Sequence, residues 1–226
     1  SQYRQIHSHE KVNNPRLLKS SLGPSFQVPK VETIPVSENV NSDLLVRKIR
    51  MLTIVWMTKD QIKRKSVYEI LEALSLLIDD GITDFEWVIA GGDSDGRKEL
   101  ETTISKLGLD PYVTLTIDVS HEQKQELFKN SDLYIQPSYY EGFGNAVLEA
   151  MSFGIVAIVS RNAAQAEVVG KTGFIVEEID KKCIADAVTQ YLQLSLDERI
   201  HLRKEVFRTV SERHLFKYRV DEFKKI

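Results

Sequence analysis

The feature that most constrains the fold is an alternation of short apolar runs with longer segments of helical periodicity, from residue 51 onward. We predict strands at 51–56, 85–90, 112–117, 132–136, 155–159 and 173–176, where the apolar runs lie. We predict helices at 66–79, 99–107, 121–129, 145–153, 181–194 and 196–210, and in the C-terminal stretch from 215. This alternation is typical of βαβ units, whose parallel strands are covered by helices on both faces.

We therefore expect an α/β fold, a doubly wound Rossmann-like domain on a mostly parallel sheet of about six strands. Sheets of this kind bind ligands in the crevice outside the carboxyl ends of their strands. A functional site should lie where strands end and helices begin.

The N-terminal stretch differs from the rest of the chain. Residues 1–45 hold four of the six prolines, are rich in Ser, Asn and Gln, and contain one strand-like piece at 31–36. We interpret residues 1–45 as a linker or interdomain segment from another domain, and residues 46–226 as the Rossmann-like domain.

Composition excludes several classes of function. The 226 residues are 42% hydrophobic, which is enough for a core, and the net charge of −3 provides no basic field for nucleic acid. The five histidines are scattered and Cys183 is the only cysteine, so we expect neither a disulfide framework nor a metal site. A single cysteine and no apolar run of about 18 residues favour a cytoplasmic location.

The segment that carries chemistry follows the strand predicted at 132–136. Gly142 and Gly144 flank a turn that opens a helix, so backbone N–H groups can approach a ligand closely, and a helix N-terminus favours an anion such as a diphosphate. The carboxylates of Glu141 and Glu149 can accept hydrogen bonds from the paired hydroxyls of a sugar or ribose. We expect both to face one crevice.

In this order, the motifs resemble a known family. Glu141 and Glu149 are separated by seven residues, Gly-Phe-Gly follows the first and Ala-Met follows the second. Residues 131–138, 154–160 and 173–176 match the strands around this motif. The chain, roughly from residue 30 onward, resembles the retaining glycosyltransferases called group 1 or family 4. Their GT-B fold sets two Rossmann-like domains across a cleft, and the C-terminal domain binds the nucleotide sugar.

The resemblance implies roles for the residues of this segment. Glu141 would contact the donor sugar and support the charge that develops at its anomeric carbon, and Glu149 would hold the ribose hydroxyls. The other residues of the segment would contact the donor mainly through their backbone. Sugar and phosphate would lie on Gly142, Phe143 and Gly144, the diphosphate on the N–H groups of Asn145 and Ala146, and the base on the loop 117–120, including Ile117 and Val119.

A basic pair is a further feature of the family, since without a metal ion cations must stabilise the diphosphate leaving group. Lys65 resembles the family's lysine, whereas the usual Gly-Arg earlier in this loop is absent. Lys59 stands as the substitute for that arginine, and Arg64 is the runner-up for either role. The alternative is that residues 59–65 form a solvated charged loop.

The resemblance implies the donor-binding half of a retaining, metal-independent glycosyltransferase. The intact protein would use no cofactor and would move a sugar from a nucleoside diphosphate sugar to the hydroxyl of a glycan or lipid-linked acceptor, the latter at the inner face of the membrane. This chain would be inactive without an N-terminal GT-B domain. The alternative is a non-catalytic nucleotide or sugar-phosphate binding subunit completed by a partner chain. An epimerase or phosphorylase of the same fold ranks last.

Overall fold

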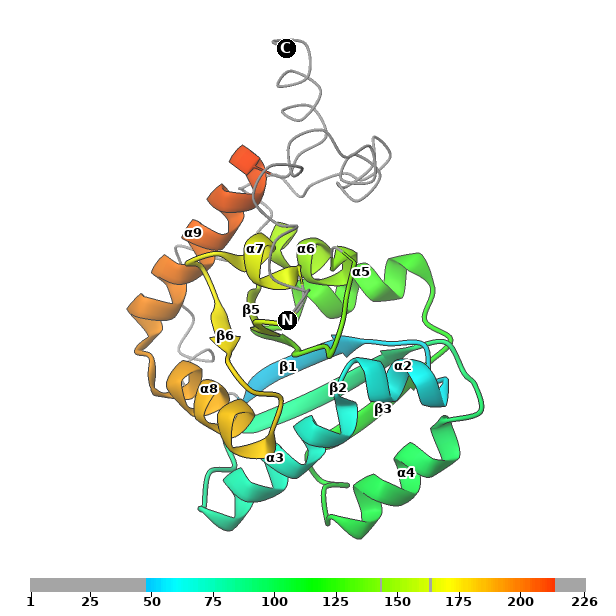
Figure 1. Ribbon diagram of the computed structural model, residues 1–226. Coiled ribbons are helices and arrows are strands. Elements are labelled where there is room, and N and C mark those ends of the chain that lie inside the picture. The colour runs from blue at the N-terminus through cyan, green and yellow to red at the C-terminus, as the bar shows by residue number, and fades with distance from the viewer. Residues whose placement is uncertain (1–47, 143, 163, 214–226) are drawn as a thin grey trace, which may run out of the picture.

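The computed structural model describes residues 48–142, 144–162 and 164–213. Its centre is a sheet of six strands in the order β3-β2-β1-β4-β5-β6, and every neighbouring pair is parallel (Figure 1). The strands are β1 (Ile49–Ile54), β2 (Phe85–Gly91), β3 (Val113–Ile117), β4 (Leu133–Gln136), β5 (Val156–Ser160) and β6 (Phe174–Val176). The predicted doubly wound parallel sheet is confirmed, and its order reverses between β1 and β4.

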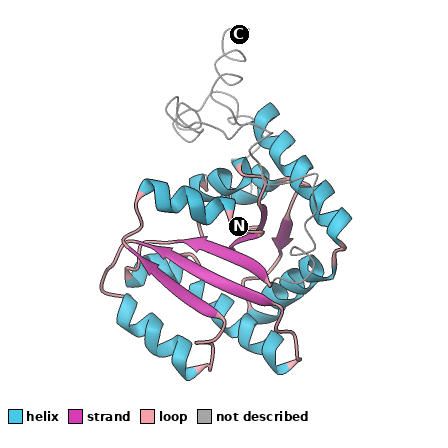
Figure 2. Ribbon diagram, turned by 180° about the vertical axis from the view of Figure 1, so that it is seen from behind, coloured by secondary structure: helices cyan, strands magenta, loops and turns pink. Residues whose placement is uncertain are grey.

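Helices cover both faces of the sheet (Figures 1 and 2). One layer contains α3 (Val67–Asp79), α4 (Arg97–Lys106) and α8 (Lys181–Gln193). The other contains α5 (His121–Lys129), α6 (Asn145–Ser152), α7 (Gln165–Val169) and α9 (Leu196–Arg213). Because both faces are covered, β4 and β5 are buried at every position, which explains why most of their residues are apolar.

The centre of the sheet opens between β1 and β4. These two strands share a register at two residue pairs, whereas β1 and β2 share six. Beyond these two pairs, hydrogen bonds that involve side chains connect β1 to β4 in place of backbone hydrogen bonds. The Thr53 hydroxyl donates to the Ile135 carbonyl and accepts from the Trp87 indole at 3.1 Å, and the Ile54 amide donates to the Tyr134 hydroxyl at 3.2 Å. The backbone pairing of β1 with β4 thus ends before the carboxyl ends of the two strands, at the topological switch point where a crevice is expected.

The structure corrects the prediction in three places. Residues 59–65 are not a charged loop, because Lys59–Arg64 form helix α2, whose N-cap Thr58 accepts a hydrogen bond from the Gln61 amide at 3.1 Å. The first strand ends at Ile54 rather than at Trp56, whose side chain is 67% exposed. Helix α7 was also not predicted.

Some predictions fall outside the described residues. These are the linker or interdomain segment at 1–45, its strand-like piece at 31–36 and the helix predicted from 215. Within the described residues, no helix is long and apolar enough to span a membrane.

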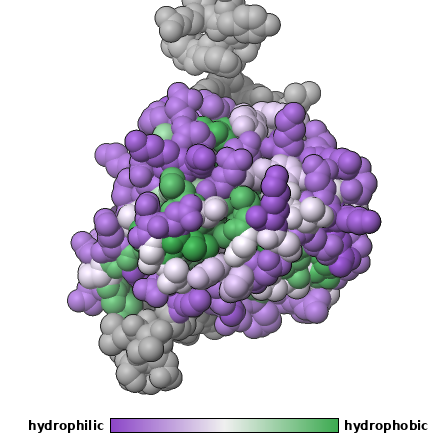
Figure 3. Space-filling view, turned by 90° about the horizontal axis from the view of Figure 1, so that it is seen from below, coloured by the Kyte–Doolittle hydropathy of each residue, from purple (hydrophilic) through white to green (hydrophobic). Residues whose placement is uncertain are grey.

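The face that carries α3, α4 and α8 is largely hydrophilic at its rim, and hydrophobic residues gather near its middle (Figure 3).

Candidate active site

A pocket of about 490 Å³ lies at the carboxyl ends of β1 and β4. Its size suits a small-molecule ligand. Both predicted carboxylates line it, together with two lysines and the start of α6. The lining residues are Ile54, Lys65, Lys124, Gln136, Glu141, Gly142, Gly144, Asn145, Ala146 and Glu149.

The turn before α6 depends on Gly144. This residue is the N-cap of α6 at φ 84°, and a Cβ there would lie 2.7 Å from Cγ of Gln165. Gly144 therefore meets both a conformational and a steric requirement for glycine. Gly142 has open space where its Cβ would be, so the ligand-free fold does not require glycine at that position.

The start of α6 offers backbone donors to the pocket. Asn145 and Ala146 occupy the first two positions of the helix, where N–H groups have no partner within the helix. The first turn of α6 contains no acidic side chain. This end of the pocket therefore favours a negatively charged ligand group.

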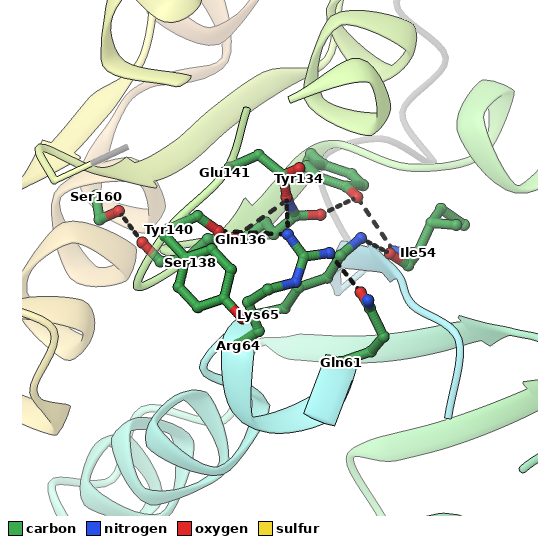
Figure 4. Close-up of polar contacts among 10 residues, drawn as sticks. All are labelled: Ile54, Gln61, Arg64, Lys65, Tyr134, Gln136, Ser138, Tyr140, Glu141 and Ser160. Carbon is green, nitrogen blue, oxygen red and sulfur yellow. Dashed lines mark hydrogen bonds and ion pairs between the residues drawn. The ribbon is translucent and has the colours of Figure 1, made fainter. Parts of the chain in front are cut away.

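Glu141 belongs to a polar network that reaches back to β1 (Figure 4). Its carboxylate accepts from Arg64 at 3.1 Å and from the buried Gln136 amide at 3.4 Å. The Gln136 side-chain oxygen accepts in turn from the Tyr134 hydroxyl at 2.8 Å. The side chains of Arg64 and Glu141 are 15% and 19% exposed, so solvent screens this pair less than a surface pair.

Lys65 is a buried cation that lines the pocket together with the two carboxylates. It lies in the short turn between α2 and α3, is 9% exposed and donates from Nζ to the Ile54 carbonyl at 2.8 Å. The Ser66 hydroxyl donates to the Pro137 carbonyl at 2.7 Å and thereby fastens this turn to the end of β4. Burial lowers the pKa of Lys65 to about 8, although the charges of Glu141 and Glu149 oppose the shift.

Glu149 lies on the second turn of α6 and pairs with Lys124 of α5. Its Oε2 accepts from Nζ of Lys124 at 2.8 Å, and the two side chains are 23% and 25% exposed. The pocket thus presents two carboxylates, each held by a cation, with Lys65 near both.

Comparison with known proteins identifies the family. The family described as "Glycosyl transferases group 1" matches residues 50–207, which is well over half of the chain. The chain belongs to the group 1 glycosyltransferases. The match includes every pocket-lining residue.

One similar relative is the GDP-mannose:cellobiosyl-diphosphopolyprenol alpha-mannosyltransferase of Xanthomonas oryzae pv. oryzae (strain PXO99A). It is 30% identical over 159 residues, which cover 68% of this glycosyltransferase chain and 42% of the relative. The chain therefore spans less than half the length of this relative.

Solved structures show the same fold. A glycosyltransferase from Rickettsia africae ESF-5 superposes with a TM-score of 0.69 at 20% identity, over 81% of this chain and 48% of that one. The C-terminal domain of a group 1 family glycosyl transferase (LpcC) from Francisella tularensis superposes with a TM-score of 0.62 at 21% identity, over 77% of this chain and 90% of that domain. The described domain thus has the Rossmann-like α/β fold of these glycosyltransferase structures.

The structure of this group 1 glycosyltransferase does not bring all predicted site residues together. Lys59 lies outside the pocket lining, is 63% exposed and pairs with Glu99 at 3.6 Å. Arg64 also lies outside the lining, but its guanidinium contacts Glu141, which lines the pocket, at 3.1 Å. Ile117 and Val119 lie at and after the end of β3, outside the lining, and Phe143 lies outside the described residues.

Sequence reasoning missed Lys124 and Gln136. Lys124 precedes Leu127 and Phe128 by three and four positions, which places it on the apolar face of α5. A lysine on such a face is the signal that could have found it. Within the described ranges, no group of three or more His, Cys, Asp or Glu side chains is arranged to hold a metal ion.

Proposed function

We propose that this chain is the donor-binding half of a retaining glycosyltransferase that moves a sugar from a nucleoside diphosphate sugar to an acceptor hydroxyl. The observation that carries the proposal is the pocket at the switch point, where Glu141 and Glu149 face two lysines and the start of α6. Hydroxyl-binding carboxylates next to anion-binding groups suit a ligand that combines sugars with a diphosphate.

The diphosphate would lie against the N–H groups of Asn145 and Ala146 and the ammonium of Lys65. As the bond from the anomeric carbon to the diphosphate oxygen breaks, negative charge grows on the leaving group. Donors already oriented in a partly desolvated pocket stabilise that charge without reorganising, so we propose a metal-independent reaction.

The transferred sugar would lie beside Glu141. Its carboxylate would bind sugar hydroxyls and stabilise the positive charge that develops at the anomeric carbon. Arg64 and Gln136 fix this carboxylate from the protein side, at 3.1 and 3.4 Å. Retention of configuration is proposed from the resemblance of this motif to the retaining family.

Glu149 would hold the ribose of the donor, and the loop 117–120, with Ile117 and Val119, would lie near the base. The name of the Xanthomonas relative gives GDP-mannose as its donor and a diphosphopolyprenol-linked sugar as its acceptor. A guanine nucleotide is therefore one donor to test. A lipid-linked acceptor would place the reaction at the cytoplasmic face of the membrane.

The acceptor site is proposed to lie on a second, N-terminal Rossmann-like domain, with residues 1–45 as the connection. The match to 90% of an isolated C-terminal domain, but to 48% of a longer glycosyltransferase, supports this division. This chain alone should bind the donor nucleotide without transferring sugar.

The first test is thermal unfolding of the 226-residue chain with UDP, GDP, ADP and CMP. A ligand of the folded state at 100 times its Kd stabilises by about 2.7 kcal/mol, which is readily measured. We expect one nucleoside diphosphate to raise Tm, and Glu149→Gln to abolish that rise.

Glu126→Gln is the matched control, because Glu126 pairs with Lys129 on α5 and lies outside the pocket lining. It should leave the nucleotide-induced rise unchanged. If none of the four nucleotides raises Tm, this chain is not a donor-binding half. If the rise survives in Glu149→Gln, Glu149 does not hold the ribose.

A further inference from the structure

The contact between Lys124 and Glu149 joins two successive helices, α5 and α6, across 25 positions of sequence. Lys124 is at the end of the first turn of α5, and Glu149 is on the second turn of α6. Nζ lies 2.8 Å from Oε2, and both side chains are about three-quarters buried in the pocket wall. Such a pair is less screened than an exposed one and orients both side chains.

The backbone at Lys124 is itself fixed by hydrogen bonds at the start of α5. The Ser120 side chain accepts from the Gln123 amide at 3.2 Å, and the Gln123 side chain accepts from the Ser120 amide at 2.8 Å. This capping box fixes the first turn of α5, and the Lys124 amide donates to the Ser120 carbonyl at 2.9 Å. The ammonium is therefore presented to Glu149 from a defined helix start.

We propose that Lys124 is a positioning residue for ribose recognition: it holds one carboxylate oxygen of Glu149 so that the other is aimed at the sugar hydroxyls. This inference rests on the proposed donor site. A free glutamate on a helix samples several rotamers, and ordering it on binding costs conformational entropy. A glutamate already fixed by Lys124 avoids most of that cost, which is the general advantage of preorganisation.

The competing role for Lys124 is direct contact with the diphosphate, because it lines the same pocket as Lys65 and Asn145. The two roles differ in what they require of the ligand. A positioning role matters only when the ribose carries hydroxyls for Glu149 to bind. A phosphate contact matters equally for nucleotides with and without those hydroxyls.

The test compares GDP and UDP with their 2′,3′-dideoxy analogues by isothermal titration calorimetry on the full chain. For the nucleotide that binds, we expect Lys124→Met to raise Kd about tenfold, which corresponds to about 1.4 kcal/mol and is the order of the cost of immobilising one glutamate side chain. The dideoxy analogue should bind the wild type and Lys124→Met equally. Lys124→Arg should restore part of the affinity, since it keeps the cation.

The control on the same helix is Lys129→Met, which removes a more exposed lysine that pairs with Glu126 and should not change Kd. In a Glu149→Gln background, Lys124→Met should have no further effect on ribonucleotide binding. Equal loss for the ribonucleotide and its dideoxy analogue would overturn the positioning role, and so would an unchanged Kd. Absence of binding to the wild type would instead overturn the proposed donor site itself.

Discussion

Lys65 is a charged side chain in a position with little access to water. Burial lowers its pKa from 10.5 to about 8, so the unfolded chain binds more protons than the folded chain between these values. Stability should therefore rise with pH across that window, while below pH 8 the unfavourable effect is fully present. Lys65→Met should stabilise the ligand-free chain at pH 7 by at most about 3 kcal/mol.

The measurement is urea unfolding from pH 7 to 10, with the exposed Lys63→Met as the matched control on α2. The difference between Lys65→Met and the wild type should narrow as pH rises above 8. A difference that is independent of pH would contradict the explanation by buried charge.

Two buried glutamines near the pocket offer a direct comparison. Neither amide atom of Gln165 has a hydrogen-bond partner within the described part of the chain, although the side chain is fully buried. Gln136 is equally buried, but its amide is bonded to Tyr134, Ser138 and Glu141. A buried polar group without a partner costs roughly 1–3 kcal/mol.

Gln165→Met should therefore raise the free energy of unfolding by about 1 kcal/mol, whereas Gln136→Met should lower it by a similar amount or more. Urea unfolding of the two variants beside the wild type measures both. Destabilisation by both substitutions would show that the Gln165 amide is satisfied in solution.

Residue spacing predicted part of this site and could not predict the rest. Glu141, Glu149 and the start of α6 lie within one short segment, so the sequence places them together. Lys124 and Gln136 gain their importance from partners on other elements or across the turn, and Lys59 turns toward Glu99 on α4. Such contacts depend on tertiary packing, which a linear pattern does not encode.

At the scale of elements, Thr53 joins three strands where the sheet opens. Its hydroxyl donates to the Ile135 carbonyl on β4 and accepts from the Trp87 indole on β2. Thr53→Val keeps the shape of the side chain but leaves a buried carbonyl and a buried N–H group without this partner. We expect a loss of about 1–3 kcal/mol in the free energy of unfolding, measured in urea.

Thr53→Ser is the matched control, since it keeps the hydroxyl and removes one methyl group, at a cost of about 1 kcal/mol. If Thr53→Val proves no less stable than Thr53→Ser, the hydroxyl does not fasten the strands.

The sequence predicted the six strands and the longer helices because their apolar periodicity extends over several residues. It missed α2 and α7, which are six and five residues long and too short to show a period. It also extended the first strand to Trp56, an apolar residue whose side chain is exposed at the end of β1. Short helices and exposed aromatic residues depend on their surroundings more than on local pattern.

At the scale of the whole molecule, the pocket is built from both halves of the sheet. Ile54 and Lys65 come from the first half, around β1, whereas Glu141, Glu149 and Lys124 come from the segment after β3. A ligand that contacts both sets would join the two halves. Its binding energy would then oppose their separation.

We expect the cognate nucleotide to slow hydrogen–deuterium exchange at the amides of β1 and β4 more than at those of the outer strands β3 and β6. Mass spectrometry of the chain with and without the nucleotide measures this. Protection confined to α6 would contradict a ligand that joins the two halves.

The pairing of β1 with β4 also constrains how the chain is made. Met51 pairs with Leu133, so during synthesis β1 lacks one neighbour until about 80 more residues have left the ribosome. In that interval an apolar strand edge is open to pairing with other chains. The arrangement that places the binding crevice between β1 and β4 therefore also leaves an unpaired strand edge on the nascent protein.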